Sequence, residues 1–189
     1  MNELENSERA NLQMQAAIVL ACAFAYFYAF KLNVFLFQSF EFSDNVNWVF
    51  IPSGLRLLFV LIFFESGAIG IALASVVINY MFGSHDDHVF NIVTGLMSGA
   101  SPLLARYITV DLFQLDATLA GLNARVLFKI SIVFALISSV LHQLWFFWND
   151  QTANFVFNTL AMAVGDWCGT VLVLATASYA LRFYKAIQR

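Results

Sequence analysis

Among the polar or charged residues inside otherwise apolar segments of this sequence, seven are the side chains that could do chemistry. They are Arg56, Asn79, Asn91, His142, Gln143, Asn158 and Asp166. A charged side chain costs about 2.5 to 3.5 kcal/mol at the centre of a membrane-spanning helix, so each charge should face inward and have a partner or a function. Asp166 is the only acid inside such a segment, which makes it the natural counter-ion for Arg56. A hydrogen-bonded pair would offset much of the cost of burying both charges.

Two interpretations of this pair stay open. It could be a structural clasp between two distant helices, or it could line a cavity that binds or relays something, with Trp167 and His142 nearby. The stretch Pro52–Gly54 also allows two interpretations, because irregular backbone at this depth must be buried or line a pocket, whereas proline is also favoured in the first turn of a helix. The predicted ligand site comprises Trp48, Pro52, Ser53, Gly54, Arg56, Asn79, His142, Asp166 and Trp167.

The composition identifies an integral membrane protein. Hydrophobic residues make up 61% of the 189 residues and charged residues 11%, with 21 Phe, and a soluble surface would need far more charge. Three acids, Glu3, Glu5 and Glu8, precede Arg9 where a signal peptide would be basic, so the first apolar segment is expected to be a true span. Cys22 and Cys168 lie in apolar segments and are expected to be packing residues.

The apolar segments predict an all-α membrane bundle of about six spanning helices, since a bilayer takes about 20 helical residues, or about 17 at the short end. The expected spans are 14–37, 48–64, 67–82, 89–108, 124–148 and 155–183, within a single domain that has a polar N-terminus (1–13) and a basic tail (184–189). The second and third are short and are separated only by Glu65, Ser66 and Gly67, a turn-forming sequence. If the chain does not turn there, one long helix replaces two and the N-terminus moves to the opposite side.

The distribution of charges favours the six-span arrangement with both termini in the cytoplasm. Short cytoplasmic loops are rich in Lys and Arg, and interfaces are rich in Trp and Tyr. In this arrangement the inner side holds Arg9, Arg106, Arg125, Lys129, Arg182, Lys185 and Arg189, and the outer loops hold Glu41, Asp44, Asp86, Asp87 and Asp150. Trp48, Trp145 and Trp148 then fall at the outer boundary, and Tyr107, Tyr179 and Tyr184 at the inner one.

Small residues at four-residue spacing predict where helices pack closely, because contacts in lipid depend on close backbone approach. Three such stripes occur: Ala17, Ala21, Ala25 and Ala29; Gly95 and Gly99; and Ala161, Gly165 and Gly169. Packing within the chain is the expected use of these stripes, in preference to a dimer interface.

Two of these regions carry a resemblance to a known family. The sequence resembles the MASE-type integral membrane sensor domains in two stretches, WVFIPSGLRLL (48–58) and VGDWCGTVLV (164–173). Asn79 is a weaker match. The resemblance implies a sensory module of a bacterial inner (plasma) membrane that binds a small ligand. Members of that kind are fused to histidine kinase or cyclic-di-GMP turnover domains, whereas this sequence ends at Arg189, so a separate signalling partner is expected.

A second hypothesis is a substrate-binding membrane component of a small-molecule importer. The helix count, the chain length and the alanine stripe of the first helix look like the vitamin-binding subunits of energy-coupling-factor transporters. In that case the stripe from Ala17 to Ala29 would face a partner. Cross-linking from Ala21 or Ala25 would then capture a coupling subunit, and in the sensor hypothesis it would capture a signalling enzyme.

An enzyme is the third possibility, and the sequence offers little for it. His85, Asp86, Asp87 and His88 have the composition of a divalent-metal site, but a solvated acidic loop is the expected structure. His142 is the only histidine inside a span, so a buried bis-histidine haem lacks a second ligand. We expect no cofactor, no metal and no nucleic-acid partner. The linker 110–123 could be an amphipathic interfacial helix or an ordinary loop.

Overall fold

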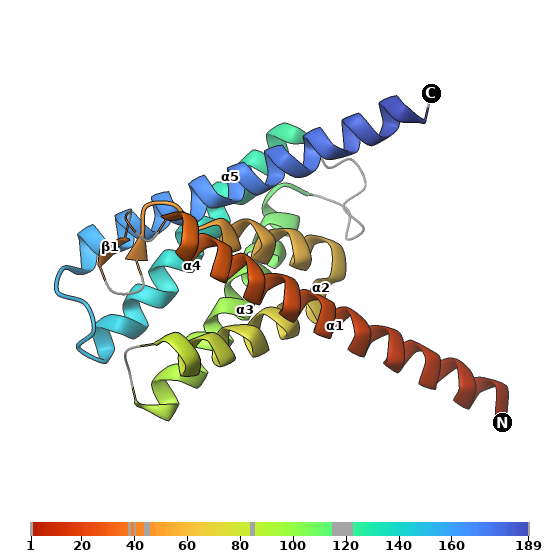
Figure 1. Cartoon of the computed structure of the whole chain (residues 1–189), viewed down its shortest axis with the longest axis horizontal. Coiled ribbons are helices and arrows are strands. Elements are labelled where there is room, and N and C mark those ends of the chain that lie inside the picture. The colour runs from red at the N-terminus through yellow and green to blue at the C-terminus, as the bar shows by residue number, and fades with distance from the viewer. Residues whose placement is uncertain are drawn as a thin grey trace.

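The protein is a bundle of long helices with one small β-hairpin (Figure 1). The computed structural model describes residues 2–37, 39, 41–43, 46–83, 86–114 and 123–188. The elements in chain order are α1 (Asn2–Phe37), β1 (Glu41–Ser43), β2 (Val46–Asn47), α2 (Ile51–Phe82), α3 (His88–Leu112), α4 (Ala124–Trp148) and α5 (Phe155–Ile187). The strands β1 and β2 pair in an antiparallel hairpin.

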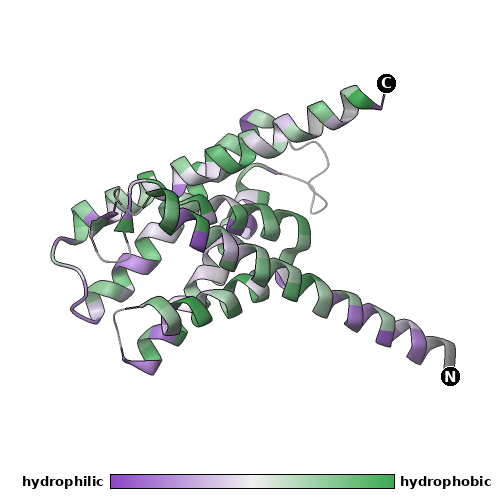
Figure 2. Ribbon diagram, in the orientation of Figure 1, coloured by the Kyte–Doolittle hydropathy of each residue, from purple (hydrophilic) through white to green (hydrophobic). Residues whose placement is uncertain are grey.

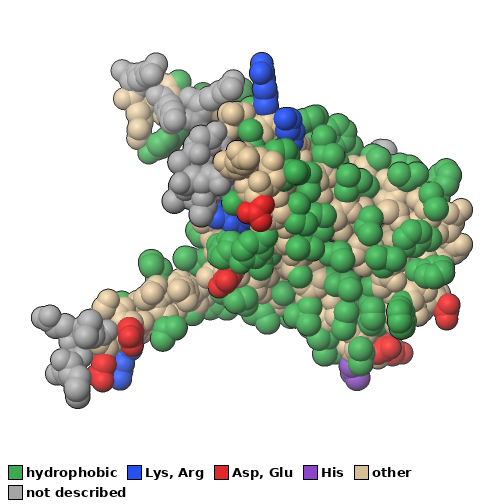
Figure 3. All heavy atoms as spheres, turned by 180° about the vertical axis from the view of Figure 1, so that it is seen from behind, with side chains coloured by type: hydrophobic (Ala, Val, Ile, Leu, Met, Phe, Trp, Pro, Cys, Tyr) green, Lys and Arg blue, Asp and Glu red, His purple; other side chains and the backbone are tan. Residues whose placement is uncertain are grey.

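Four of the helices in the described part of the chain are long and apolar enough to cross a membrane. They are α1, α2, α4 and α5. Hydrophobic residues predominate along these helices in Figure 2, apart from the hydrophilic start of α1, and hydrophobic side chains are spread over the body of the molecule in Figure 3. The predicted all-α membrane bundle is therefore confirmed. The predicted count of six spanning helices is not confirmed. The described residues form five helices, and α3 is not among the four that are long and apolar enough to cross a membrane.

Helix α2 reverses direction at Phe64, next to the predicted turn at Glu65–Gly67. Phe64 has a φ of 52° and a ψ of −119°, which no α-helix contains. A Cβ atom on Gly67 would lie 2.5 Å from the carbonyl oxygen of Phe59, although residues eight apart in a straight helix are separated by about 12 Å along its axis. Two antiparallel halves, 51–63 and 65–82, therefore pack against each other as a helical hairpin.

The bundle has two distinct ends (Figure 1). One, the terminal end, holds both chain termini and the bend at Phe64. The opposite end, the loop end, holds the β-hairpin and the α2–α3 and α4–α5 connections. At the loop end, the Asn33 side chain accepts a hydrogen bond of 2.8 Å from the backbone N–H of Ile51 and so fixes α1 to the start of α2.

Two of the three small-residue stripes pack within the chain, as predicted. Gly95 and Gly99 of α3 face the second half of α2, where added Cβ atoms would overlap Val76 and Ala68. Gly165 and Gly169 of α5 lie against the backbone of Asn47 and Phe50.

The prediction is wrong for the stripe on α1. Ala17, Ala21 and Ala25 are exposed, because α1 turns the opposite face, with Cys22 and Tyr26, toward the bundle. Larger side chains therefore make the contact that the small ones were expected to make. The predicted linker 110–123 lies mostly outside the described residues, and α3 extends into it as far as Leu112.

Candidate functional site

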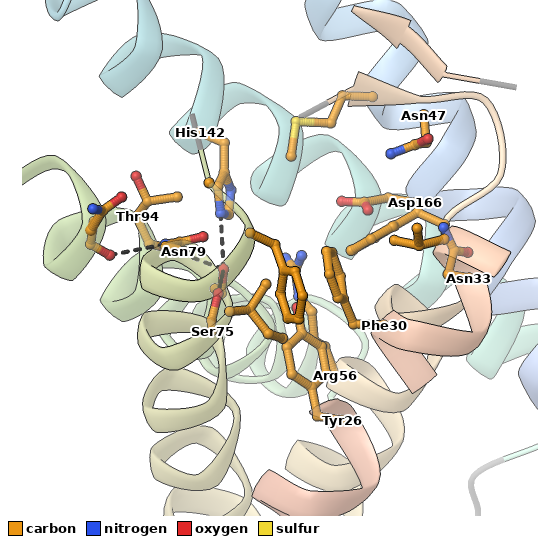
Figure 4. A pocket seen from close by; sticks show the side chains of 18 of the residues that line it. Tyr26, Phe30, Asn33, Asn47, Arg56, Ser75, Asn79, Thr94, His142 and Asp166 are labelled. Carbon is orange, nitrogen blue, oxygen red and sulfur yellow. Dashed lines mark hydrogen bonds between the residues drawn. The ribbon is translucent and has the colours of Figure 1, made fainter. Parts of the chain in front are cut away.

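A cavity of about 450 Å³ lies between the helices and extends from the loop end into the bundle (Figure 4). Every helix contributes to its wall. Its deep part includes Arg56 of α2, Ser98 of α3, His142 of α4 and Asp166 of α5. Its rim at the loop end includes Lys31, Glu41, Asn47 and Gly83. A volume in this range is typical of small-molecule sites in proteins.

Arg56 is anchored to the two helices opposite α2. The side chain is 1% exposed, and one terminal guanidinium nitrogen donates to the hydroxyl oxygens of Ser101 (3.0 Å) and Ser138 (2.5 Å). The guanidinium carbon also lies 5.3 Å from the ring centroid of Phe134, a cation–π distance. The Nε–H group is buried and has no hydrogen-bond partner among the described residues. Arg56 thus connects α2 with α3 and α4, and keeps one donor unused.

Asp166 is the opposite case, a buried carboxylate beside the hydroxyl groups of Ser53 and Ser138 that makes no well-formed hydrogen bond in the described part of the chain. The residue is 1% exposed, and neither carboxylate oxygen accepts a hydrogen bond there. The predicted hydrogen-bonded pair with Arg56 is therefore wrong, because the guanidinium nitrogen turns toward the serines of α3 and α4 and not toward α5. Both side chains nevertheless line the same cavity.

His142 belongs to a hydrogen-bond chain along one wall of the cavity. Its Nδ1 lies 2.8 Å from the carbonyl oxygen of Ser138, and because a carbonyl can only accept, Nδ1 carries a proton. Its Nε2 faces the hydroxyl of Ser98 at 3.3 Å, and the hydroxyl of Ser75 donates to Ser98 at 2.9 Å. This chain fixes the imidazole ring in place at the depth of Arg56.

Asn79 completes this wall, since its side-chain nitrogen donates to the carbonyl oxygen of Asn91 at 2.9 Å. Gln143 and Asn158 instead hold the α4–α5 connection in place. The hydroxyl of Thr152 donates to the side-chain oxygen of Gln143 at 2.9 Å and accepts from the side-chain nitrogen of Asn158 at 2.6 Å.

The structure brings four of the nine predicted site residues to the cavity, namely Arg56, Asn79, His142 and Asp166. The other five do not line it, and they are Trp48, Pro52, Ser53, Gly54 and Trp167.

Each of these five has another environment. Pro52 lies in the first turn of α2, as the second interpretation of this stretch expected. Ser53 faces Thr170 of α5 at 3.2 Å, and a Cβ atom on Gly54 would meet Val173 at 2.5 Å, so this stretch is a packing seam. Trp48 packs edge-on against Phe42 at the loop end, and Trp167 edge-on against Phe128.

Several lining residues were not predicted, and a sequence signal existed for most of them. Ser75 and Asn79 are four residues apart, and Asn91, Thr94 and Ser98 are three and four apart. Polar residues at these spacings share one face of a helix, so two polar stripes mark the walls. Tyr26, Phe30 and Asn33 of α1 show a similar spacing, but among many aromatic residues they do not stand out.

The described residues of the loop 85–88 make local contacts at the start of α3. Asp87 caps α3, accepting hydrogen bonds from the backbone N–H groups of Val89 and Phe90. His88 contacts the hydroxyl of Tyr80 at 3.1 Å, and His85 lies outside the described residues. Over the residues that the structure covers, no three His, Cys, Asp or Glu side chains come close enough to hold a metal ion.

Comparison with known proteins found no match to a protein family, to a curated protein or to a solved structure.

Proposed function

We propose that this protein is a sensor-like module of a bacterial inner (plasma) membrane, which binds a small ligand in the cavity and signals through a separate partner. One observation carries the proposal: Arg56 and Asp166, both buried, line a single cavity without a hydrogen bond between them. A purely structural clasp would pair them, because separate burial of two charges is costly. Unused donors and acceptors on a cavity wall suit a ligand that has complementary groups.

The proposal includes six membrane crossings with both termini in the cytoplasm. The bend at Phe64 supports it, since segments 51–63 and 65–82 run in opposite directions. Segment 51–63 is only about 20 Å long, so the residues before it must complete this crossing. The charges also support it: Arg125 and Lys129 begin α4 at the terminal end, whereas Glu41 and Asp150 lie at the loop end. The loop end would then face outward, and the cavity would be reached from outside.

Single-cysteine labelling of intact cells and of inverted membrane vesicles tests this arrangement. Glu65→Cys, next to the bend, should react with a charged maleimide only in inverted vesicles, and Asp150→Cys only in intact cells. Cys22 and Cys168 are replaced by serine in both variants. If Glu65→Cys reacts from neither side, α2 does not reach the inner face at its bend and the six-crossing arrangement is wrong.

Native mass spectrometry of protein extracted gently from membranes tests ligand binding. We expect a small molecule that copurifies with the wild type and is lost from a variant with a filled cavity, Ser98→Phe. The matched control is Ser178→Phe, an exposed position on α5. Equal retention of the molecule by both variants would place it outside the cavity and contradict the proposal.

A second candidate function, a substrate-binding component of an importer, is favoured by one feature of α1. Ala17, Ala21 and Ala25 form an exposed strip of small residues on this helix, and such a strip allows the close approach of a partner helix. Photo-cross-linking from Ala21 or Ala25, with Leu172 of α5 as the exposed control, separates the two functions. Capture of a transporter coupling subunit would favour import, and capture of a signalling enzyme would favour the sensor.

A further inference from the structure

The deep part of the cavity presents one unsatisfied donor and two unsatisfied acceptors of opposite charge. The donor is the Nε–H of Arg56, and the acceptors are the two carboxylate oxygens of Asp166. The residues come from α2 and α5, and both are 1% exposed. Each orphaned polar atom carries a desolvation cost that a ligand group of the right kind would remove.

The balance of charge restricts that ligand. Both side chains are 1% exposed, so little water screens them. Arg56 and an ionised Asp166 together are neutral, so a ligand with a single charge would leave one of these two charges uncompensated. The same holds at the rim, where Lys31 and Glu41 also balance. A molecule that has both charges avoids this cost, because its cation can bind Asp166 and its anion can bind Arg56.

The remaining wall is aromatic. Tyr26 and Phe30 of α1, Phe90 of α3 and Phe146 of α4 line the same cavity, and Figure 4 shows Tyr26 and Phe30 around the space that Arg56 and Asp166 border. Aromatic faces bind apolar groups and also attract an ammonium group. The wall therefore suits a ligand with an apolar portion beside its charged groups.

We propose that the cavity binds a zwitterionic small molecule of the amino-acid type, with its ammonium group on Asp166, its carboxylate on the Nε–H of Arg56 and its apolar portion among the aromatic rings. This inference rests on the proposed function, since it specifies the ligand of the same cavity. It assigns Asp166 as a specificity-determining residue, because neither carboxylate oxygen makes a well-formed hydrogen bond within the described chain.

Four probes with one skeleton and different charges test the proposal by calorimetry on the full chain in lipid nanodiscs. They are phenylalanine (zwitterion), phenethylamine (cation), 3-phenylpropanoate (anion) and phenethyl alcohol (neutral). We expect phenylalanine to bind about tenfold or more tightly than either singly charged probe, since each loses one charged hydrogen bond. Asp166→Asn should weaken the binding of phenylalanine and phenethylamine by about tenfold or more and strengthen the binding of 3-phenylpropanoate, because the anion then compensates Arg56 and leaves no second charge unpaired. Asp150→Asn, an exposed acid at the loop end, is the matched control.

The outcomes separate this inference from the proposed function. If a singly charged or neutral probe binds as tightly as phenylalanine, or if Asp166→Asn binds phenylalanine like the wild type, the inference is wrong and the cavity is still a binding site. A copurifying molecule that lacks one of the two charges leads to the same conclusion. If no probe binds and no small molecule copurifies with the wild type, both the inference and the proposed function are wrong.

Discussion

Helices α2 and α5 meet in two regions. Polar side chains are hydrogen-bonded in one of them and lack hydrogen bonds in the other. In the seam around Ser53, Gly54 and Gly169, the residues are small and the hydroxyl of Ser53 is paired with Thr170. One turn away on α5, Asp166 has its carboxylate buried and without a hydrogen bond from the described residues. Thr170 even donates to the backbone carbonyl of Asp166, at 2.7 Å, so one helical turn separates a satisfied site from an unsatisfied one. We infer from this comparison that the seam stabilises the fold, whereas the unsatisfied carboxylate in the cavity wall lowers the stability of the fold and is available to a ligand.

The largest expected effect comes from enlarging the seam. In Gly169→Leu, the new Cβ atom would overlap the carbonyl oxygen of Phe50, so we expect a loss of stability of about 3 kcal/mol or failure to fold. Ala175→Leu, at an exposed position of the same helix, is the control. Thermal unfolding in detergent measures both. Equal melting temperatures would show that α5 and the start of α2 are not in close contact.

Arg56→Met should have the next largest effect, because it removes the group that connects the cavity wall of α2 to Ser101 and Ser138. We expect a loss of about 2 kcal/mol, the scale of hydrogen bonds to a charged group. Asp166→Asn in the same chain should recover part of that loss, since the lone carboxylate no longer has a counter-charge across the cavity. The exposed Arg125→Met is the control. If the two changes are strictly additive in denaturation experiments, the charges are not coupled.

Apolar length predicted the class of the fold well, and some boundaries closely. The predicted span 124–148 coincides with α4, and the reversal near Glu65 lies at Phe64. Helix α1 begins twelve residues before the predicted span 14–37, because hydropathy marks the lipid-facing segment and not the helix, which continues into the polar N-terminus. The apolar length of α3 was overestimated for a similar reason, since polar cavity residues interrupt its hydrophobic run.

The candidate site was predictable in part. Buried charges in apolar segments correctly pointed to Arg56 and Asp166 as cavity residues, because the energetic argument depends only on residue type and depth. The partner of each charge could not be predicted, since that depends on the rotation of each helix about its axis. The serines that bind Arg56 occur among many small residues, and nothing in their local sequence distinguishes them from Ser53 in the seam.

Asp166→Asn alone should change stability in the opposite direction from Arg56→Met. Replacing a buried carboxyl group that has no hydrogen bond with an amide that stays neutral removes the cost of burying its charged form, so we expect a gain of about 1 kcal/mol in the free energy of unfolding. Binding of phenylalanine should weaken by about tenfold or more in the same variant. A gain in stability together with a loss of binding would identify a functional residue, whereas a loss of stability would mean that Asp166 supports the fold. Asp150→Asn should change neither property.

The smallest effect is expected from removing a hydroxyl group in the seam. Ser53→Ala removes one hydroxyl–hydroxyl contact of 3.2 Å, and Thr170 still donates to the carbonyl oxygen of Asp166, so we expect a loss of only about 0.5 kcal/mol. Ligand binding should not change, because Ser53 does not line the cavity. Thermal unfolding and calorimetry on the same sample measure both quantities, with the exposed Ser178→Ala as the control. If Ser53→Ala weakens binding as strongly as Asp166→Asn does, the seam and the cavity wall act as one site, and stability and binding are not divided between the two sides of α5.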